Sequence, residues 1–198
     1  MTVPDARTSL AVSSGQGLHT DALATLRAWT PPTDGQATLR DRFVAHLAAR
    51  PDGVWRSSYP EHVTAGTLVL SGDGTQVLLN LHRKARRWFH FGGHCEEGDR
   101  TLAGVALREA LEESGLSGPD DLAFHPEPLH LDAHVVPFCG DRGEVTHLDV
   151  RYAALAHDGA VHQVSAESLD VRWWPVDALP DVEPAMTWFV HHARDVLC

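Results

Sequence analysis

Basic residues are scarce in this sequence. It contains 16 Lys and Arg residues against 27 Asp and Glu residues, and its formal net charge is −11. Non-specific binding to nucleic acid depends on neutralising phosphates with Lys and Arg, so this charge balance argues against a nucleic-acid partner. It is compatible with a small phosphorylated substrate that a local metal ion holds.

Long apolar runs are also missing. No run reaches the roughly 18 residues that a membrane span requires, so we expect no membrane partner. Residues 1–17 lack the basic start and apolar centre of a signal peptide and are rich in Ser, Thr and Gly. We expect residues 1–18 to form a poorly ordered leader.

Cysteine is rare as well. Cys95, Cys139 and Cys198 are odd in number, and their spacing fits no metal-binding motif. The simplest interpretation is a reduced, cytoplasmic setting. No His–Asn arrangement accompanies Cys95, so we do not expect this residue to be a nucleophile.

Two short helices should precede the main domain. Apolar residues at helical spacing predict helices over residues 21–29 and 36–49, and prolines follow both. Together they form a helical extension over residues 19–60. This extension could cap a cleft, mediate a homodimer or pack on the main domain.

The sequence pattern becomes that of strands after residue 61. Runs rich in Leu and β-branched residues predict strands at 62–71, 76–82, 88–91, 130–137, 146–156 and 171–175. One internal helix is expected over residues 101–114 and a closing helix over 183–197. Strands on both sides of an internal helix predict an α/β (α+β) sandwich on a mixed sheet over residues 61–198.

The segment from Gly92 to Leu116 carries the strongest chemical signal. Gly92 and Gly93 are expected to open a loop that allows close backbone approach. Glu109, Glu112 and Glu113 follow at helical positions i, i+3 and i+4, so their carboxylates share one face. A cation would relieve their repulsion, and Mg²⁺ usually binds a few carboxylates together with substrate phosphates. The alternative is a solvated acidic face.

This segment resembles the Nudix box, whose pattern is G-x5-E-x7-R-E-U-x-E-E-x-G-U, with U a bulky aliphatic residue. Residues 108–116 match its second half, with Ala110 at a U position. Counted from Gly93, the acidic position of the first half falls on Asp99. Eight residues separate it from Arg108, where the pattern has seven. We interpret the difference as a one-residue expansion of the loop before the helix.

The resemblance implies a pyrophosphohydrolase with an α/β/α sandwich fold. Glu109, Glu112 and Glu113 would hold Mg²⁺ or Mn²⁺ with help from the Gly92 or Gly93 carbonyl, and Arg108 would orient the carboxylates. Glu112 and Glu113 are also the first candidates for the general base, followed by Glu144. Water would attack a phosphorus atom of a nucleoside diphosphate linked to another moiety. Nucleoside triphosphates, ADP-ribose-like compounds and nucleotide sugars all remain open as the small-molecule substrate.

Two other functions are compatible with such a fold. A Nudix-like sensor would bind a ligand without turning it over, but such proteins usually lose box carboxylates and this chain keeps all three. An isopentenyl diphosphate isomerase would need a Cys and a Glu placed for proton transfer, and Cys95 lies in a different local context.

A second polar constellation follows the box. Polar and apolar residues alternate over 130–135 and 147–152, which predicts two half-buried strands. A hairpin turn at Gly140-Asp141 would pair His134 with His147, Asp132 with Asp149, and His130 with Arg151. Two facing Asp residues need a compensating charge or proton.

We expect this polar face to line the substrate cleft and to hold ribose, a sugar or an additional metal. The alternative is a solvated outer face with a slipped register. Residues of the box and of the basic turn before it are also expected to contact the substrate. The complete set is Arg87, His94, Asp99, Asp132, His134, His147, Asp149 and Arg151.

Overall fold

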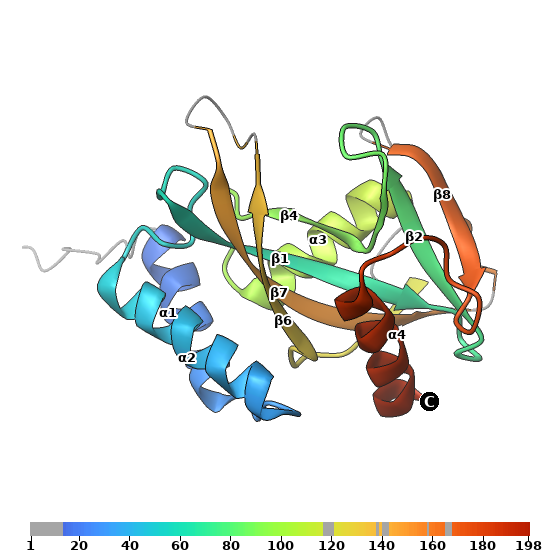
Figure 1. Ribbon diagram of the computed structural model, residues 1–198, viewed down its shortest axis with the longest axis horizontal. Helices are drawn as coiled ribbons and strands as arrows, with labels where there is room; N and C mark the ends of the chain where they lie inside the picture. Colours follow the sequence, from blue (N-terminus) through green and yellow to red (C-terminus); the bar gives the residue numbers. More distant parts are fainter. Residues whose placement is uncertain (1–13, 117–120, 138, 140–142, 158, 165–167) are drawn as a thin grey trace, which may run out of the picture.

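A curled mixed sheet forms the centre of the molecule (Figure 1). The computed structural model describes residues 14–116, 121–137, 139, 143–157, 159–164 and 168–198. The strands in these ranges are β1 (Glu61–Leu70), β2 (Gln76–His82), β3 (Trp88–Phe89), β4 (Phe91–His94), β5 (Leu122–Phe124), β6 (His130–Val136), β7 (Val145–Ala156) and β8 (Ser168–Pro175). The helices are α1 (Ser14–Ala28), α2 (Asp34–Ala49), α3 (Leu102–Ser114) and α4 (Pro184–Leu197).

Strand β1 organises the sheet. One of its edges pairs in parallel with β7 along the whole strand, from Glu61 opposite Thr146 to Leu70 opposite Leu155. The other edge is shared, because β4 pairs with residues 64–67 and β2 pairs with residues 69–70. Strands β5 and β6 pair with β7, and β3 and β8 pair with β2. This arrangement places β4 beside the middle of β1. Helix α3 is the next element along the chain.

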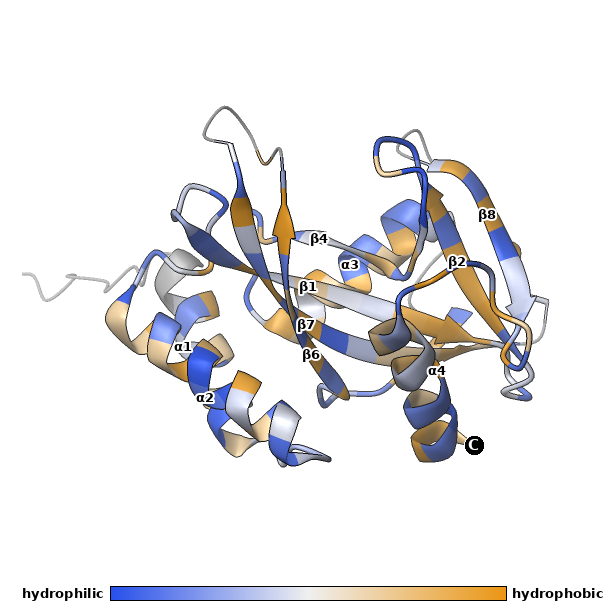
Figure 2. Ribbon diagram, viewed as in Figure 1, coloured by the Kyte–Doolittle hydropathy of each residue, from blue (hydrophilic) through white to orange (hydrophobic). Residues whose placement is uncertain are grey.

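Helices cover both faces of the sheet. The side chains of Val63 and Ala65 pack in a cluster with α1, α2 and α3, whereas those of Leu68 and Leu70 pack with α4. Side chains alternate between the two faces of a strand, so α4 lies on the face opposite α3. Because both faces are covered, β1 is buried from His62 to Leu70, although its first residues are polar and its ribbon begins blue in Figure 2.

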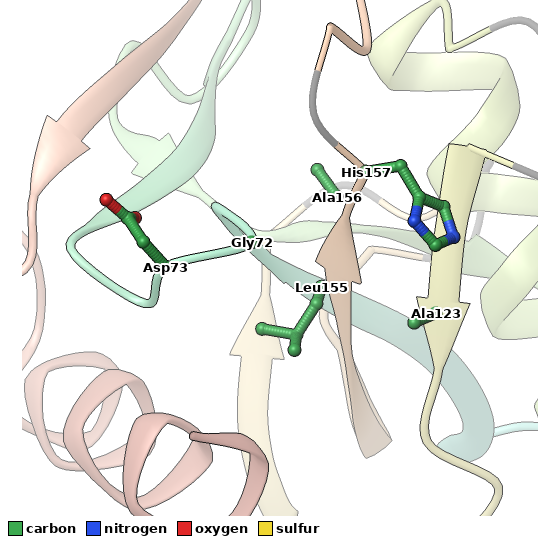
Figure 3. Close-up of a pocket in the computed structure, with 6 residues that line it drawn as sticks. All are labelled: Gly72, Asp73, Ala123, Leu155, Ala156 and His157. Atoms are coloured by element: carbon green, nitrogen blue, oxygen red, sulfur yellow. The ribbon is translucent and has the colours of Figure 1, made fainter.

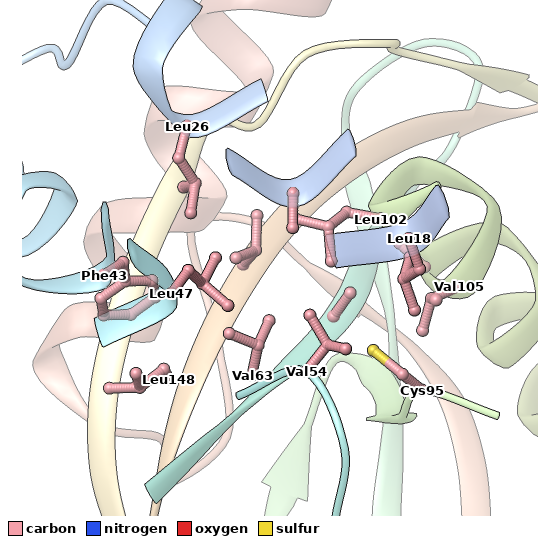
Figure 4. Close-up of a cluster of buried hydrophobic side chains, with 14 of the residues drawn as sticks. Leu18, Leu26, Phe43, Leu47, Val54, Val63, Cys95, Leu102, Val105 and Leu148 are labelled. Carbon is pink, nitrogen blue, oxygen red and sulfur yellow. The ribbon is translucent and has the colours of Figure 1, made fainter. Parts of the chain in front are cut away.

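The N-terminal helices pack on the sheet. Leu18, Leu26, Phe43 and Leu47 are fully buried in one cluster with sheet residues such as Val63 (Figure 4). Helix α1 begins at Ser14, inside the predicted leader, because Leu18 belongs to this core. Residues 1–13 of the predicted leader lie outside the described residues.

Helix α2 also completes an edge of the sheet. The buried side chain of Gln36 donates a hydrogen bond to the Leu131 carbonyl oxygen (2.9 Å) and accepts one from the Leu131 N–H (2.6 Å). A single amide side chain thus satisfies the backbone of Leu131, at an edge of β6 that pairs with no other strand of the described ranges.

The α+β fold predicted from the sequence is confirmed, with two local differences. Gly92 and Gly93 were expected in a loop but lie in β4, where they pair with Gly66 and Ala65. Strand β5 was not predicted, since three residues are too few to show an alternating pattern. The predicted turn residues Gly140 and Asp141 lie outside the described residues. No helix in the described ranges has the length and apolar character needed to cross a bilayer.

Candidate active site on helix α3

Helix α3 has well-defined ends. At its start the Thr101 hydroxyl accepts a hydrogen bond from the Gly104 N–H (3.0 Å), and at its end Gly115 adopts a left-handed conformation with φ of 68°. Buried Val105, Ala106 and Ala110 fix the apolar side of the helix against the sheet. The polar side therefore presents Arg108, Glu109 and Glu112 next to β4.

Two carboxylates of α3 lie against the backbone of β4. The Gly92 N–H donates a hydrogen bond to Glu113 Oε2 (2.9 Å). At Gly93, an added Cβ would lie 2.7 Å from the carboxylate carbon and from both oxygens of Glu109. Glycine at this position lets the Glu109 carboxylate lie directly against the strand, and any side chain there would displace this carboxylate.

Arg108 connects the acidic residues of the site. Its guanidinium donates hydrogen bonds to Glu109 Oε1 (2.9 Å), Glu112 Oε2 (3.1 Å) and Asp99 Oδ2 (3.1 Å). It also donates to the backbone carbonyl of His94 (2.9 Å). Asp99, at the end of the expanded loop, thus lies beside Arg108.

The three Glu residues of α3 differ in exposure. Glu113 is buried, the Glu109 side chain is 13% exposed and that of Glu112 is 59% exposed. Burial raises the pKa of Glu109 to about 7, against the opposing effect of Arg108. Burying a carboxylate disfavours its charged form, and a divalent cation would offset that cost.

Two shallow hollows differ in their chemistry. The first, of about 410 Å³, is lined by Gly104, Leu107, Arg108, Leu111 and Glu112 and therefore includes the exposed carboxylate of α3. The second, of about 380 Å³, lies where β1 and β7 end, and its lining includes Asp73, Leu155 and His157 (Figure 3). Leu155 is six residues beyond Asp149 along β7, which places it roughly 20 Å from the level of His94 in β4. Only the first hollow adjoins the residues that the sequence predicts to act.

The predicted register of the β6–β7 hairpin is confirmed. Asp132 pairs with Asp149, His134 with His147 and His130 with Arg151. The alternative of a slipped, solvated face is wrong, because Asp149 and Arg151 are 5% and 6% exposed. Helix α4 covers part of this face, with the ring of Phe189 stacked on His130 at 5.3 Å.

Arg151 compensates the two facing aspartates. Its Nε donates to Asp149 Oδ2 (2.7 Å) and its Nη2 donates to Asp132 Oδ2 (2.8 Å). Asp149 also accepts a hydrogen bond from the Thr64 hydroxyl (2.9 Å) and lies 3.3 Å from His90 Nε2. Burial acts to raise the pKa of Asp149, but Arg151 and His90 outweigh it and hold this pKa well below its usual value.

We predict that Asp149→Ala lowers the free energy of unfolding by about 3 kcal/mol, because Arg151 loses the buried partner of its Nε atom and keeps only the partly exposed Asp132. Urea denaturation monitored by circular dichroism measures this change. The matched control is Asp170→Ala, which removes a partly exposed ion pair with Arg172 and should cost at most about 1 kcal/mol. Equal effects of the two substitutions would contradict the structural importance of the buried pair.

His94 and His147 meet two residues that sequence reasoning missed. Ligand atoms of His62, His94, Cys139 and His147 all lie within 4.8 Å of one another. Burial, with a smaller effect of the neighbouring imidazoles in the same direction, lowers the pKa of His94 to about 4 and that of His147 to about 3. In the sequence, the one indication of this cluster was that His62 and His147 both lie near the starts of predicted strands. The cysteine spacing along the chain pointed to no metal site.

Two further residues lie close to the box in sequence, Arg87 before it and Cys95 within it. Arg87, predicted to meet phosphates, forms an exposed ion pair with Glu183 (3.0 Å) at the start of α4. Burial raises the pKa of Cys95 to about 12, which is the opposite of what a nucleophilic thiolate requires.

Residues 60–193 match the NUDIX domain. The chain belongs to the Nudix family. A Nudix hydrolase of Rhodococcus erythropolis, orf19, is 28% identical over 178 residues, which cover 84% of this chain and 91% of that relative. Together these matches identify a Nudix pyrophosphohydrolase.

Solved Nudix structures have the same fold at low sequence identity. The Ap4A hydrolase of Caenorhabditis elegans, in a binary complex, has a TM-score of 0.54 and 17% identity, covering 68% of this chain and 96% of its own. A Nudix-family hydrolase of Clostridium perfringens has a TM-score of 0.51 and 21% identity, covering 69% and 95%. The NUDIX domain of Shewanella oneidensis NrtR, complexed with ADP ribose, has a TM-score of 0.50 and 22% identity, covering 72% and 92%.

Proposed function

We propose that this Nudix enzyme hydrolyses a phosphoanhydride bond in a nucleoside diphosphate linked to another moiety, using Mg²⁺ or Mn²⁺ at α3. The observation that carries the proposal is the convergence of box carboxylates on β4. Glu109 lies against Gly93, Glu113 accepts from the Gly92 N–H, and Arg108 joins Glu109 to Glu112.

The donor set fits a hard divalent cation. Its ligand atoms would be carboxylate oxygens of Glu109, Glu112 and Glu113, with the Gly93 carbonyl oxygen as a further candidate, and Mg²⁺ and Mn²⁺ prefer oxygen ligands. The raised pKa of Glu109 marks a carboxylate that a cation would stabilise in its charged form. When bound, the cation would neutralise phosphate charge and lower the pKa of an attached water molecule.

The protein residues divide the remaining tasks. We assign Glu112 as the general base, because its side chain is the most exposed of the three and borders the hollow on α3. Glu113 is held by Gly92 and Asn80, which suits a ligand in a fixed position. Arg108 positions Glu109 and Glu112 and is itself anchored by Asp99.

A second region for substrate contact would lie on the polar face of the β6–β7 hairpin, on the α4 side of the sheet, and would hold a part of the substrate that extends away from the α3 carboxylates. The side chains of Asp132 and His134 are 23% and 38% exposed and form an ion pair (2.9 Å) that can meet ribose or sugar hydroxyls. Asp149 and Arg151 are buried behind them and position Asp132. One solved relative is an Ap4A hydrolase and another is bound to ADP ribose. Dinucleotides and ADP-ribose-like compounds are therefore the first substrates to test.

The test is hydrolysis of a substrate panel by the purified chain, with products identified by mass. The panel contains nucleoside triphosphates, Ap4A, ADP-ribose and nucleotide sugars, each with Mg²⁺, with Mn²⁺ and with EDTA. We expect cleavage of one class at a phosphate–phosphate bond and loss of that cleavage in EDTA. Binding without turnover across the panel would instead support a ligand-binding sensor.

A further inference from the structure

We propose that His62, His94, Cys139 and His147 bind one Zn²⁺ ion in a closed, four-coordinate site on the face of the sheet opposite α3. The four ligand atoms lie within 4.8 Å of one another. Structural zinc sites are almost always tetrahedral and are built from Cys and His ligands.

The two sulfur–nitrogen distances in the cluster fit a tetrahedral ion. The Cys139 Sγ atom lies 3.4 Å from His94 Nε2 and 3.8 Å from His62 Nε2. With Zn–S near 2.3 Å and Zn–N near 2.0–2.1 Å, tetrahedral angles place sulfur and nitrogen ligands about 3.6 Å apart. The two measured separations fall on either side of this value.

The strand register brings the histidines to one face. His62 of β1 lies directly opposite His147 of β7, and His94 of β4 pairs with Thr64, two residues further along β1. Neighbouring Gly93 faces Glu109 on the α3 side, so the His94 ring points to the other face. The proposed zinc site and the carboxylate site are therefore separated by the sheet.

The surroundings of the imidazoles favour a metal over a simple packing role. His62 Nδ1 lies 3.1 Å from the Ser58 carbonyl oxygen, so this nitrogen carries the proton and Nε2 is left with a lone pair toward the cluster. His147 Nε2 is buried and has no hydrogen-bond partner among the described residues. Buried polar atoms are nearly always satisfied, and a zinc ion would satisfy this one.

The ligand types select the metal and its role. Three imidazoles and one thiolate suit Zn²⁺ and differ from the oxygen donors that suit Mg²⁺ or Mn²⁺. Four protein ligands leave no position open for water, so the ion would be structural. It would tie Cys139, between β6 and β7, to the ends of three strands, including the His94 end of β4 that Arg108 holds.

The test is titration of the metal-free protein with Co²⁺ in excess Mg²⁺, which occupies oxygen sites. We expect one Co²⁺ per chain, visible bands of tetrahedral intensity and a near-ultraviolet band from thiolate-to-Co²⁺ charge transfer. Zn²⁺ should displace the Co²⁺ and abolish these bands. Zinc measured by mass spectrometry should approach one ion per chain after purification without chelators.

Cys139→Ser should abolish the near-ultraviolet band and weaken Zn²⁺ binding by at least about 100-fold, since even loss of an outer partner costs 10–100-fold. Cys198→Ser removes an exposed cysteine and is the matched control, with unchanged spectra. His147→Gln gives a second test if Cys139→Ser fails to fold. Absence of stoichiometric binding by the unaltered chain, or a charge-transfer band retained in folded Cys139→Ser, would overturn the proposal.

Discussion

Glu113→Gln is expected to lower kcat by about 10³-fold, within the range found for loss of a positioned catalytic group. Glutamine keeps the shape of the side chain and can still accept the hydrogen bond from the Gly92 N–H. It removes the negative charge that a divalent cation requires. Steady-state kinetics with the best substrate of the panel, at saturating Mg²⁺, measures the change.

Glu127→Gln provides the control for Glu113→Gln. Glu127 is exposed in the segment between β5 and β6, away from α3, so its replacement should leave kcat unchanged. Thermal unfolding of both variants shows whether the fold is retained. A folded Glu113→Gln enzyme with the kcat of the unaltered chain would remove Glu113 from the metal site.

Gly93→Ala is expected to lower kcat/KM by about 10²-fold, although it alters no charged group. The added methyl would lie 2.7 Å from the Glu109 carboxylate, which must then move. Displacing a catalytic group by about 1 Å can cost about 10²-fold in rate. The measurement is kcat/KM as a function of Mg²⁺ concentration, with a higher Mg²⁺ requirement expected for the variant.

Gly35→Ala is the matched control for Gly93→Ala. Gly35 lies in the first turn of α2, and the nearest atom to an added Cβ is Thr33 Oγ1 at 3.8 Å. Activity should therefore be retained. If Gly93→Ala is as active as Gly35→Ala, the contact between β4 and Glu109 does not position the carboxylate.

The elements with a clear period were predictable from the sequence. Strand β2 begins and ends at the predicted residues, and α3 starts after the predicted Thr101. Gly92 and Gly93 were placed in a loop because glycine weakens isolated strands. In the folded chain they pair with Gly66 and Ala65, where tertiary packing outweighs local preference.

The candidate site could be predicted only where its residues are close together in the sequence. Arg108, Glu109, Glu112 and Glu113 occupy one helix, so their spacing revealed a common face. The His–Cys cluster joins His62 to Cys139 and His147, which are more than seventy residues further along the chain. The parallel pairing of β1 with β7 brings His62 and His147 together, and no sequence pattern indicated a register for that pair.

The central claim is that the carboxylates of α3 hold the divalent cation. Its most direct test is a measurement of Mn²⁺ binding by electron paramagnetic resonance, in the presence of the α,β-methylene analogue of ADP. The account predicts that Mn²⁺ binding is lost when Glu109, Glu112 and Glu113 are all replaced by Gln and is kept in Cys139→Ser. Equal Mn²⁺ binding by the unaltered chain and the triple variant would contradict it.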